Sequence, residues 1–193
     1  CLSFGCKELS SRGTVPSETN PDTLVELPQT DNATSEKQVE SPYLKEYEAR
    51  IEELRRNEME KKTAIVHAIH EYTTHEMSQF LSIDDLETLH ENIESLAYGQ
   101  AEPYKPIRSK PDNQIKSPSL RHYAWNIGER LDIPLIDRAK FIKTIFPHEL
   151  ENATIEYLCK NLRDSVPAII AIDVPKNGDY HFSCMRTSAD SDN

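Results

Sequence analysis

The sequence predicts a mostly helical fold that ends in a small β-hairpin, with a helical hairpin followed by a winged-helix-like module. Two observations support this prediction. Apolar residues recur at helical spacing in several segments, each bounded by a proline, a glycine or a capping residue. Two strand-like runs, 168–173 and 179–185, then follow with Asn177-Gly178 between them, a pair that suits a tight hairpin turn. The order of three helices and a hairpin is typical of a winged helix.

Residues 1–42 are expected to form a disordered polar leader, and residues 186–193 a disordered tail. The leader is rich in Ser, Thr, Pro, Asn and Glu and shows no sustained apolar period. The chain begins with Cys1, so a fragment start and a lipidated mature N-terminus on a polar tether both stay open. No apolar run approaches the roughly 20 residues that span a bilayer. We therefore expect no membrane span and a cytoplasmic protein.

The segment from Pro42 to about Phe80 predicts one long helix, because it is rich in strong helix formers. Its first half, residues 43–62, is highly charged and carries a narrow apolar stripe that Glu58 and Lys61 interrupt. The stripe consists of Leu44, Tyr47, Ile51 and Leu54. Such a seam suits a homodimer through residues 43–62, but it is too short for a certain coiled coil. Local packing on the same chain is the alternative.

An antiparallel helical hairpin is expected to complete residues 43–99. Its second helix starts at Ser82, a suitable N-cap, and ends at Gly99. Residues 64–102 contain eight acids and no Lys or Arg, so the outer surface of the hairpin should be acidic. This surface would suit a basic protein partner. Residues 100–117 contain several prolines and scattered basic residues, which indicates a basic linker.

The winged-helix-like domain is expected to span residues 118–185. Its first helix begins at Ser119, which can act as the cap, and ends before Asp132-Ile133-Pro134. The second runs from about Asp137 to Phe146 and stops at a proline. The third is expected to be capped by Asn152 and to present an apolar face that includes Cys159.

The sequence contains no motif for catalysis, a cofactor or a metal. His70 and His75 are five residues apart, one too many for HExxH, so they lie about 140° apart around a helix and cannot both face one ion. No phosphate-binding glycine loop is found, and only five glycines are available to build one. Cys159 and Cys184 fall on predicted inward faces and are expected to be buried thiols. We therefore predict that the protein is not an enzyme and binds no metal or cofactor.

Nucleic-acid binding is the specific function that this predicted fold favours. Residues 103–147 contain nine Lys or Arg and four acids, and the third helix of the module would act as a recognition helix. Side chains of the first two helices would contact phosphates, and the hairpin tip would reach a neighbouring groove. The predicted contacts are Arg121, Lys140, Lys143, Thr154, Tyr157, Lys160, Asn161, Arg163 and Lys176.

A family resemblance points the same way. The run LRHYAWNIGERLDIPLIDRAKFIKTIFPHELENATIEYLCKNLRD, with the preceding SIDDLETLHENIESLAYG, resembles accessory proteins of bacterial mobilisable transposons. The resemblance covers about Lys62 to Met185. It rests on the overall residue pattern around Trp125, Phe146-Pro147 and Leu162-Arg163 rather than on a defining motif. It implies a small, non-catalytic bacterial protein that assists an integrase or relaxase on DNA.

The sequence therefore supports two functions. One is a non-enzymatic DNA-binding accessory protein that uses the winged-helix-like module. Such a protein could bind DNA as a dimer through residues 43–62. The alternative is a helical protein–protein interaction adaptor whose acidic hairpin docks a basic partner without binding DNA. A membrane-tethered lipoprotein is a third class, which depends on a signal segment before Cys1.

Overall fold

The computed structural model describes residues 41–99, 103–176 and 178–186, and this part of the chain contains five α-helices, one short 3-10 helix and no strand. The elements are α1 (Pro42–Met77), α2 (Ile83–Tyr98), α3 (Ser117–Arg130), α4 (Leu135–Ile145), α5 (Ile155–Asn161) and η1 (Ser183–Met185). The expected leader up to residue 40, part of the linker (100–102), Asn177 and the tail from residue 187 lie outside the described residues. None of the described helices is long and apolar enough to cross a membrane.

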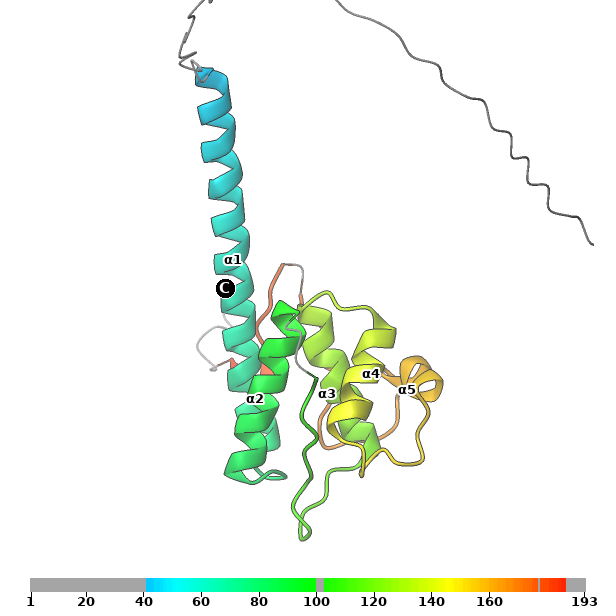
Figure 1. Ribbon diagram of the computed structural model, residues 1–193. Helices are drawn as coiled ribbons and strands as arrows, with labels where there is room; N and C mark the ends of the chain where they lie inside the picture. The colour runs from blue at the N-terminus through cyan, green and yellow to red at the C-terminus, as the bar shows by residue number, and fades with distance from the viewer. Residues whose placement is uncertain (1–40, 100–102, 177, 187–193) are drawn as a thin grey trace, which may run out of the picture. The chain divides into compact units, whose positions relative to one another are not determined.

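α1 and α2 form the predicted antiparallel helical hairpin (Figure 1). α2 begins after Ser82, whose hydroxyl oxygen accepts a hydrogen bond from the N–H of Asp85 at 3.2 Å. It ends at Gly99, which adopts a φ of 67° that favours glycine. Only the second half of α1 faces the core, where Ile69 and Tyr72 are buried. The first half of α1 extends beyond the hairpin and is largely exposed.

The described part of the expected linker packs against the helices. Asn92 of α2 donates its side-chain amide to the C=O of Lys105 and accepts from the N–H of the same residue, each at 2.8 Å. Ile107 donates its N–H to the C=O of Ile145 at 2.8 Å, and its side chain is buried. These contacts make residues 103–116 part of the same compact unit as the helices.

α3 lies at the centre of the core and packs against α4, which in turn packs against α5 (Figure 1). Every residue from Ser119 to Gly128 is buried. A helix enclosed in this way is usually apolar all round, yet α3 carries a row of polar side chains on one face. The row consists of Ser119, His122, Asn126 and Arg130, at the three- and four-residue spacing that aligns side chains along a helix.

The first half of this polar row binds the backbone of the extended segment that follows α5. The Ser119 hydroxyl accepts a hydrogen bond from the N–H of Ile169 at 3.1 Å. The Nδ1 atom of His122 bonds to the C=O of Ile170 at 2.8 Å, and its Nε2 atom bonds to the C=O of Asp164 at 3.0 Å. These side chains therefore take the place of a neighbouring strand for residues 164–170.

Asn126 continues the row and uses both ends of its amide. Its nitrogen donates to the Tyr72 hydroxyl at 2.7 Å and to the C=O of Ala171 at 2.9 Å. Its oxygen accepts from the N–H of Asp173 at 2.8 Å. The side chain is fully buried, and this one amide joins α1, α3 and the extended segment.

Arg130 ends the row and holds the last part of the segment. Its guanidinium donates to the C=O groups of Asp173, Tyr180 and His181 at 2.9–3.1 Å. The same group lies over the Phe182 ring at 3.6 Å from the ring centre. Burial lowers the pKa of Arg130, and the carboxylate of Asp173 opposes that shift, so the group stays a cation at neutral pH.

The mostly helical fold is confirmed, but the described residues do not support the predicted β-hairpin or the winged-helix module. Within 168–176 and 178–182 the described chain is extended, bent or turned and pairs into no strand, and residues 183–185 form η1. The physical reason is the polar row of α3, which binds the backbone groups of the first run that a partner strand would otherwise bind. Alternating apolar residues mark an extended chain, but they do not reveal which groups satisfy its backbone.

Three smaller expectations were also wrong. α3 begins two residues before the predicted cap, at Ser117, because Pro118 occupies its first turn and Ser119 bonds to the extended segment instead. Thr154, rather than Asn152, caps α5. Cys159 is only partly buried, and Cys184 is exposed, because residues 183–185 form a turn on the surface instead of a core strand.

We expect Asn126→Ala to lower the free energy of unfolding by about 3 kcal/mol, because it removes three hydrogen bonds, to the buried Tyr72 hydroxyl and to the partly buried C=O of Ala171 and N–H of Asp173. Urea denaturation followed by circular dichroism measures this change. The matched control is Asn57→Ala on the exposed half of α1, which should change stability by less than about 0.5 kcal/mol. Equal effects of the two substitutions would contradict the role given to Asn126.

Candidate functional site

Two of the nine predicted nucleic-acid contacts are engaged inside the fold. The Arg121 side chain is 3% exposed, pairs with Asp164 and donates to the C=O of Asn161 at 2.9 Å. Lys143 donates its ammonium to the C=O groups of Leu150 and Glu151 in the turn after α4. The Arg121 guanidinium thus neutralises the Asp164 carboxylate, and the Lys143 ammonium binds two backbone carbonyls, so this fold does not favour either side chain as a phosphate contact.

Three further predicted contacts help to build α5. The Thr154 hydroxyl accepts from the N–H of Tyr157 at 3.1 Å, and the Asn161 side chain donates to the C=O of Tyr157 at 2.7 Å. The Tyr157 ring is half exposed and lies beside the Arg121 guanidinium. These residues hold together a helix of seven residues, which is short for a recognition helix.

The remaining four predicted contacts are exposed cations that come from different elements. Lys140 of α4 forms a surface ion pair with Asp137 at 3.1 Å. Arg163 places its guanidinium over the Trp125 ring at 4.9 Å from the ring centre. Lys160 and Lys176 are exposed on α5 and on the segment before η1. Without the predicted wing and hairpin, no common element orients these four side chains.

The second half of α1 carries two side-chain clusters that are better defined. In the first, His70 of α1 stacks on His90 of α2 with ring centres 4.6 Å apart. The two Nδ1 atoms face each other at 2.5 Å. The outer nitrogens of the pair then bond to Glu94 at 3.0 Å and to Thr74 at 3.1 Å. Four side chains thus form one hydrogen-bonded chain across the hairpin.

This chain is complete when both imidazole rings are neutral. Thr74 then donates its hydroxyl to His90, His90 donates from Nδ1 to His70, and His70 donates from Nε2 to the Glu94 carboxylate. The Nδ1 contact holds a single hydrogen, so only protonation of both rings would set two N–H groups against each other. Burial and the neighbouring His70 lower the pKa of His90, and Glu94 opposes the shift. Burial therefore favours an uncharged His90 ring.

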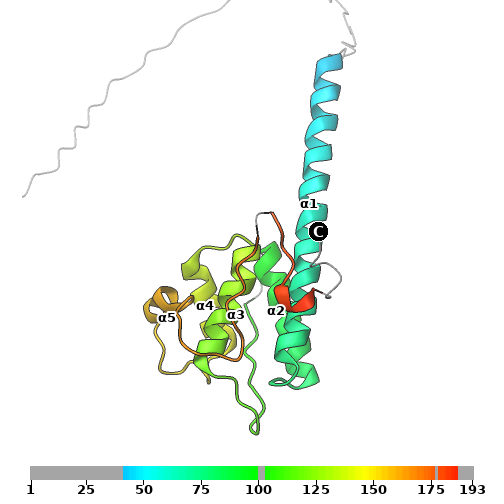
Figure 2. The same ribbon diagram turned by 180° about the vertical axis from the view of Figure 1, so that it is seen from behind.

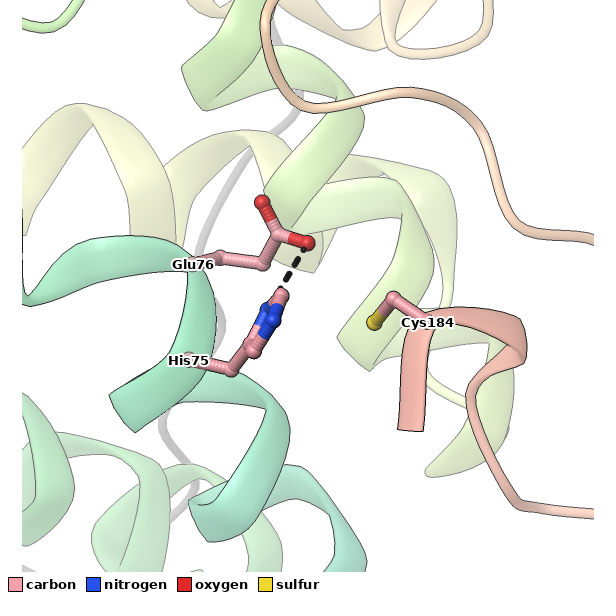
Figure 3. Close-up of side chains that lie close together, drawn as sticks. All are labelled: His75, Glu76 and Cys184. Carbon is pink, nitrogen blue, oxygen red and sulfur yellow. Dashed lines mark ion pairs between the residues drawn. The ribbon is translucent and has the colours of Figure 1, made fainter. Parts of the chain in front are cut away.

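The second cluster joins the end of α1 to η1. His75, Glu76 and Cys184 each offer one donor atom, and these atoms lie within 4.8 Å of one another. The side chains converge in Figure 3, with the Cys184 sulfur directed toward the two residues of α1. Figure 2 shows η1 beside the last turns of α1. The Nδ1 atom of His75 lies 3.4 Å from the Glu76 carboxylate.

The thiol of Cys184 is strongly disfavoured as a thiolate in this position. Partial burial of the sulfur, the charge of Glu76 and a hydrogen bond to that carboxylate raise the pKa of Cys184 to about 11. A protonated thiol is a poor nucleophile. The cluster is therefore unsuited to covalent catalysis by Cys184, and its nitrogen, oxygen and sulfur atoms suit the binding of a cation instead.

α1 also borders a large open groove. The groove has a volume of about 840 Å³ and runs along one face of α1, from Glu52 to Glu71. Tyr180 and His181 form its other wall, and Met59 and Ala68 contribute apolar surface. Beside the groove, the first half of α1 exposes an apolar stripe with Leu44 56% exposed and Tyr47 63% exposed.

Sequence reasoning missed both clusters because each depends on residues from different elements. His90 faces His70 only through the packing of α1 on α2, and no spacing along the chain marks the pair. Cys184 was assigned to a core strand, so its approach to His75 was not considered. The available signals were His70 and His75 on the first helix and Cys184 near the C-terminal end, but none of them indicated its partner on another element.

Comparison with protein-family models, with curated proteins and with solved structures finds no match to this chain. The resemblance to accessory proteins of mobilisable transposons therefore stays an expectation from the sequence.

The His70–His90 pair should make stability depend on pH. Because the pKa of His90 is lower in the folded chain than in the unfolded one, the unfolded chain binds more protons below about pH 6.5. The stability that the uncharged His90 ring contributes to the folded chain is complete above about pH 6.5 and is lost as the pH falls. We expect the melting temperature to decline from pH 6.5 to 5, and to decline less in His90→Gln. The exposed His67→Gln is the control, and parallel curves for wild type and His90→Gln would contradict the pairing.

The raised pKa of Cys184 predicts slow alkylation. At pH 8, iodoacetamide should modify Cys184 at least about tenfold more slowly than an ordinary cysteine with a pKa near 8.5. Glu76→Gln removes the adjacent negative charge and should speed the reaction several-fold. Peptide mass spectrometry follows each cysteine separately, and Cys159 serves as the internal control. An unchanged rate for Cys184 in Glu76→Gln would refute the contact.

Proposed function

We propose that this protein is a non-enzymatic helical interaction module that associates with a second copy through the first half of α1. The observation that supports the proposal is the apolar stripe on that half, where Leu44 and Tyr47 are more than half exposed. A contiguous apolar surface on a soluble helix marks an interaction site. DNA binding is not favoured, because Arg121 and Lys143 are engaged within the fold.

The stripe continues the face of α1 that enters the core. At 100° per residue, Leu44, Ile51 and Leu54 lie on the same side of the helix as Ile69 and Tyr72. In the second half of α1 this side is covered by α2 and α3. In the first half, no described residue of the chain covers this side of α1. The apolar side of the first half is therefore available to a second molecule.

The charges beside the stripe favour an antiparallel arrangement of the two copies. With Ile51 of one copy against Leu54 of the second, Glu48 of each copy faces Arg55 of the other. A parallel arrangement in register instead places Arg50 opposite Arg55, and two Glu58 side chains opposite each other. Opposite charges beside an apolar seam stabilise pairing and like charges oppose it, so the antiparallel arrangement is preferred.

The antiparallel arrangement also accommodates the polar interruption of the stripe. It places Glu58 of one copy opposite Tyr47 of the other, where the tyrosine hydroxyl can donate to the carboxylate. Lys61 lies opposite Leu44 at the end of the overlap, where its ammonium can reach water. The overlap then matches the exposed part of α1, and it ends where α1 enters the core.

The oligomeric state of the full chain tests this proposal. We expect a dimer in sedimentation equilibrium at micromolar concentration and a folded monomer for Ile51→Glu, because a buried carboxylate in the seam is costly. Circular dichroism confirms that the variant is folded. A wild-type chain that stays monomeric up to about 100 μM, or a dimer that Ile51→Glu leaves intact, would contradict the proposal.

Charge reversal distinguishes the two orientations. Arg55→Glu should weaken an antiparallel dimer about fivefold or more at low salt, since Glu48 then faces a like charge, and Glu48→Arg in the same chain should restore it. The same substitution would strengthen a parallel dimer by relieving the repulsion from Arg50. Arg56→Glu is the matched control, because Arg56 points away from the seam and should have little effect.

A further inference from the structure

The cluster of His75, Glu76 and Cys184 combines three kinds of ligand atom from two elements that are distant in sequence. Two of the residues end α1 and the third lies in η1. The three donor atoms are within 4.8 Å of one another. Two ligands of one tetrahedral Zn²⁺ ion lie about 3.5 Å apart, as bond lengths of 2.0–2.3 Å require. If the three donor atoms moved about 1 Å closer together, their separations would match those between ligands of one Zn²⁺ ion.

The surroundings allow this approach. The His75 side chain is 53% exposed and Cys184 is exposed, so both can change rotamer without disturbing the core. The Glu76 side chain is only 16% exposed and provides a fixed point. η1 is a single turn on an extended segment, and it can move more easily than a packed helix.

The donor set indicates the kind of cation. Imidazole nitrogen and cysteine sulfur bind Zn²⁺ and similar first-row ions, whereas Mg²⁺ and Ca²⁺ prefer oxygen ligands alone. The Glu76 carboxylate lies beside the sulfur and supplies negative charge that attracts a cation. One imidazole, one carboxylate and one thiolate leave a fourth position of a tetrahedral ion open to water.

We propose that His75, Glu76 and Cys184 form a binding site for Zn²⁺ or a similar divalent transition-metal ion. On binding, the metal displaces the thiol proton of Cys184 to solvent and forms a bond to the sulfur. The bound ion links η1 to the end of α1. The site is distinct from the interaction surface on the first half of α1, so metal binding and self-association can be tested separately.

Titration of the metal-free full chain with Co²⁺ tests the proposal, because a thiolate bound to Co²⁺ gives a charge-transfer band in the near ultraviolet. We expect this band in the wild-type chain and its loss in Cys184→Ser. Competition with Zn²⁺ should abolish the band in the wild type. His75→Ala and Glu76→Gln should each weaken Co²⁺ binding at least about tenfold, since each removes one of three protein ligands.

Matched substitutions test the other three cysteines and one exposed histidine of α1. Cys1→Ser, Cys6→Ser, Cys159→Ser and His67→Ala should each leave both the band and the affinity unchanged. A band that persists in Cys184→Ser, or the absence of a band in the wild-type chain at millimolar Co²⁺, would overturn the proposal. Zn²⁺ should also raise the melting temperature of the wild type and not that of Cys184→Ser, and an equal rise in both would place the ion elsewhere.

Discussion

The row of polar side chains on α3 is the constraint on which the rest of the structure depends. Ser119, His122, Asn126 and Arg130 lie along one face of a helix that is otherwise enclosed by the core. They bind the backbone of an extended segment that has no strand as a partner in the described part of the chain. Buried backbone groups must find hydrogen-bond partners, and here helix side chains provide them.

This row determines where the candidate metal site lies. Asn126 fixes the N–H of Asp173, and the Asp173 carboxylate in turn accepts from the N–H of Ser183 at 2.6 Å. Phe182 stacks on Tyr72 of α1 with ring centres 3.8 Å apart, and the Arg130 guanidinium covers the same ring. These contacts hold η1 against α1 and bring Cys184 to His75. The site is therefore a consequence of the packing of α3.

The helices could be predicted from the sequence, because their information is local. Apolar spacing placed α2 and α4 within about two residues of their observed bounds, and Ser82 and Gly99 supplied the caps of α2. The hairpin failed because the partners of residues 168–173 lie on α3, and side-chain acceptors leave no periodic signal. Arg121 was placed on the surface for a similar reason: its partner Asp164 comes close only in the folded chain. The self-pairing of α1 remains a proposal.

Hydrogen exchange of the full chain, followed by NMR at single residues, tests the central role of the α3 row most directly. The amides of Ile169 and Asp173 bond to Ser119 and Asn126, so they should exchange more slowly than an unstructured peptide although they lie outside helices and strands. The Asp173 amide should lose this protection in Asn126→Ala. Rapid exchange of both amides in the wild-type chain would contradict the account, because the extended segment would then not be held by α3.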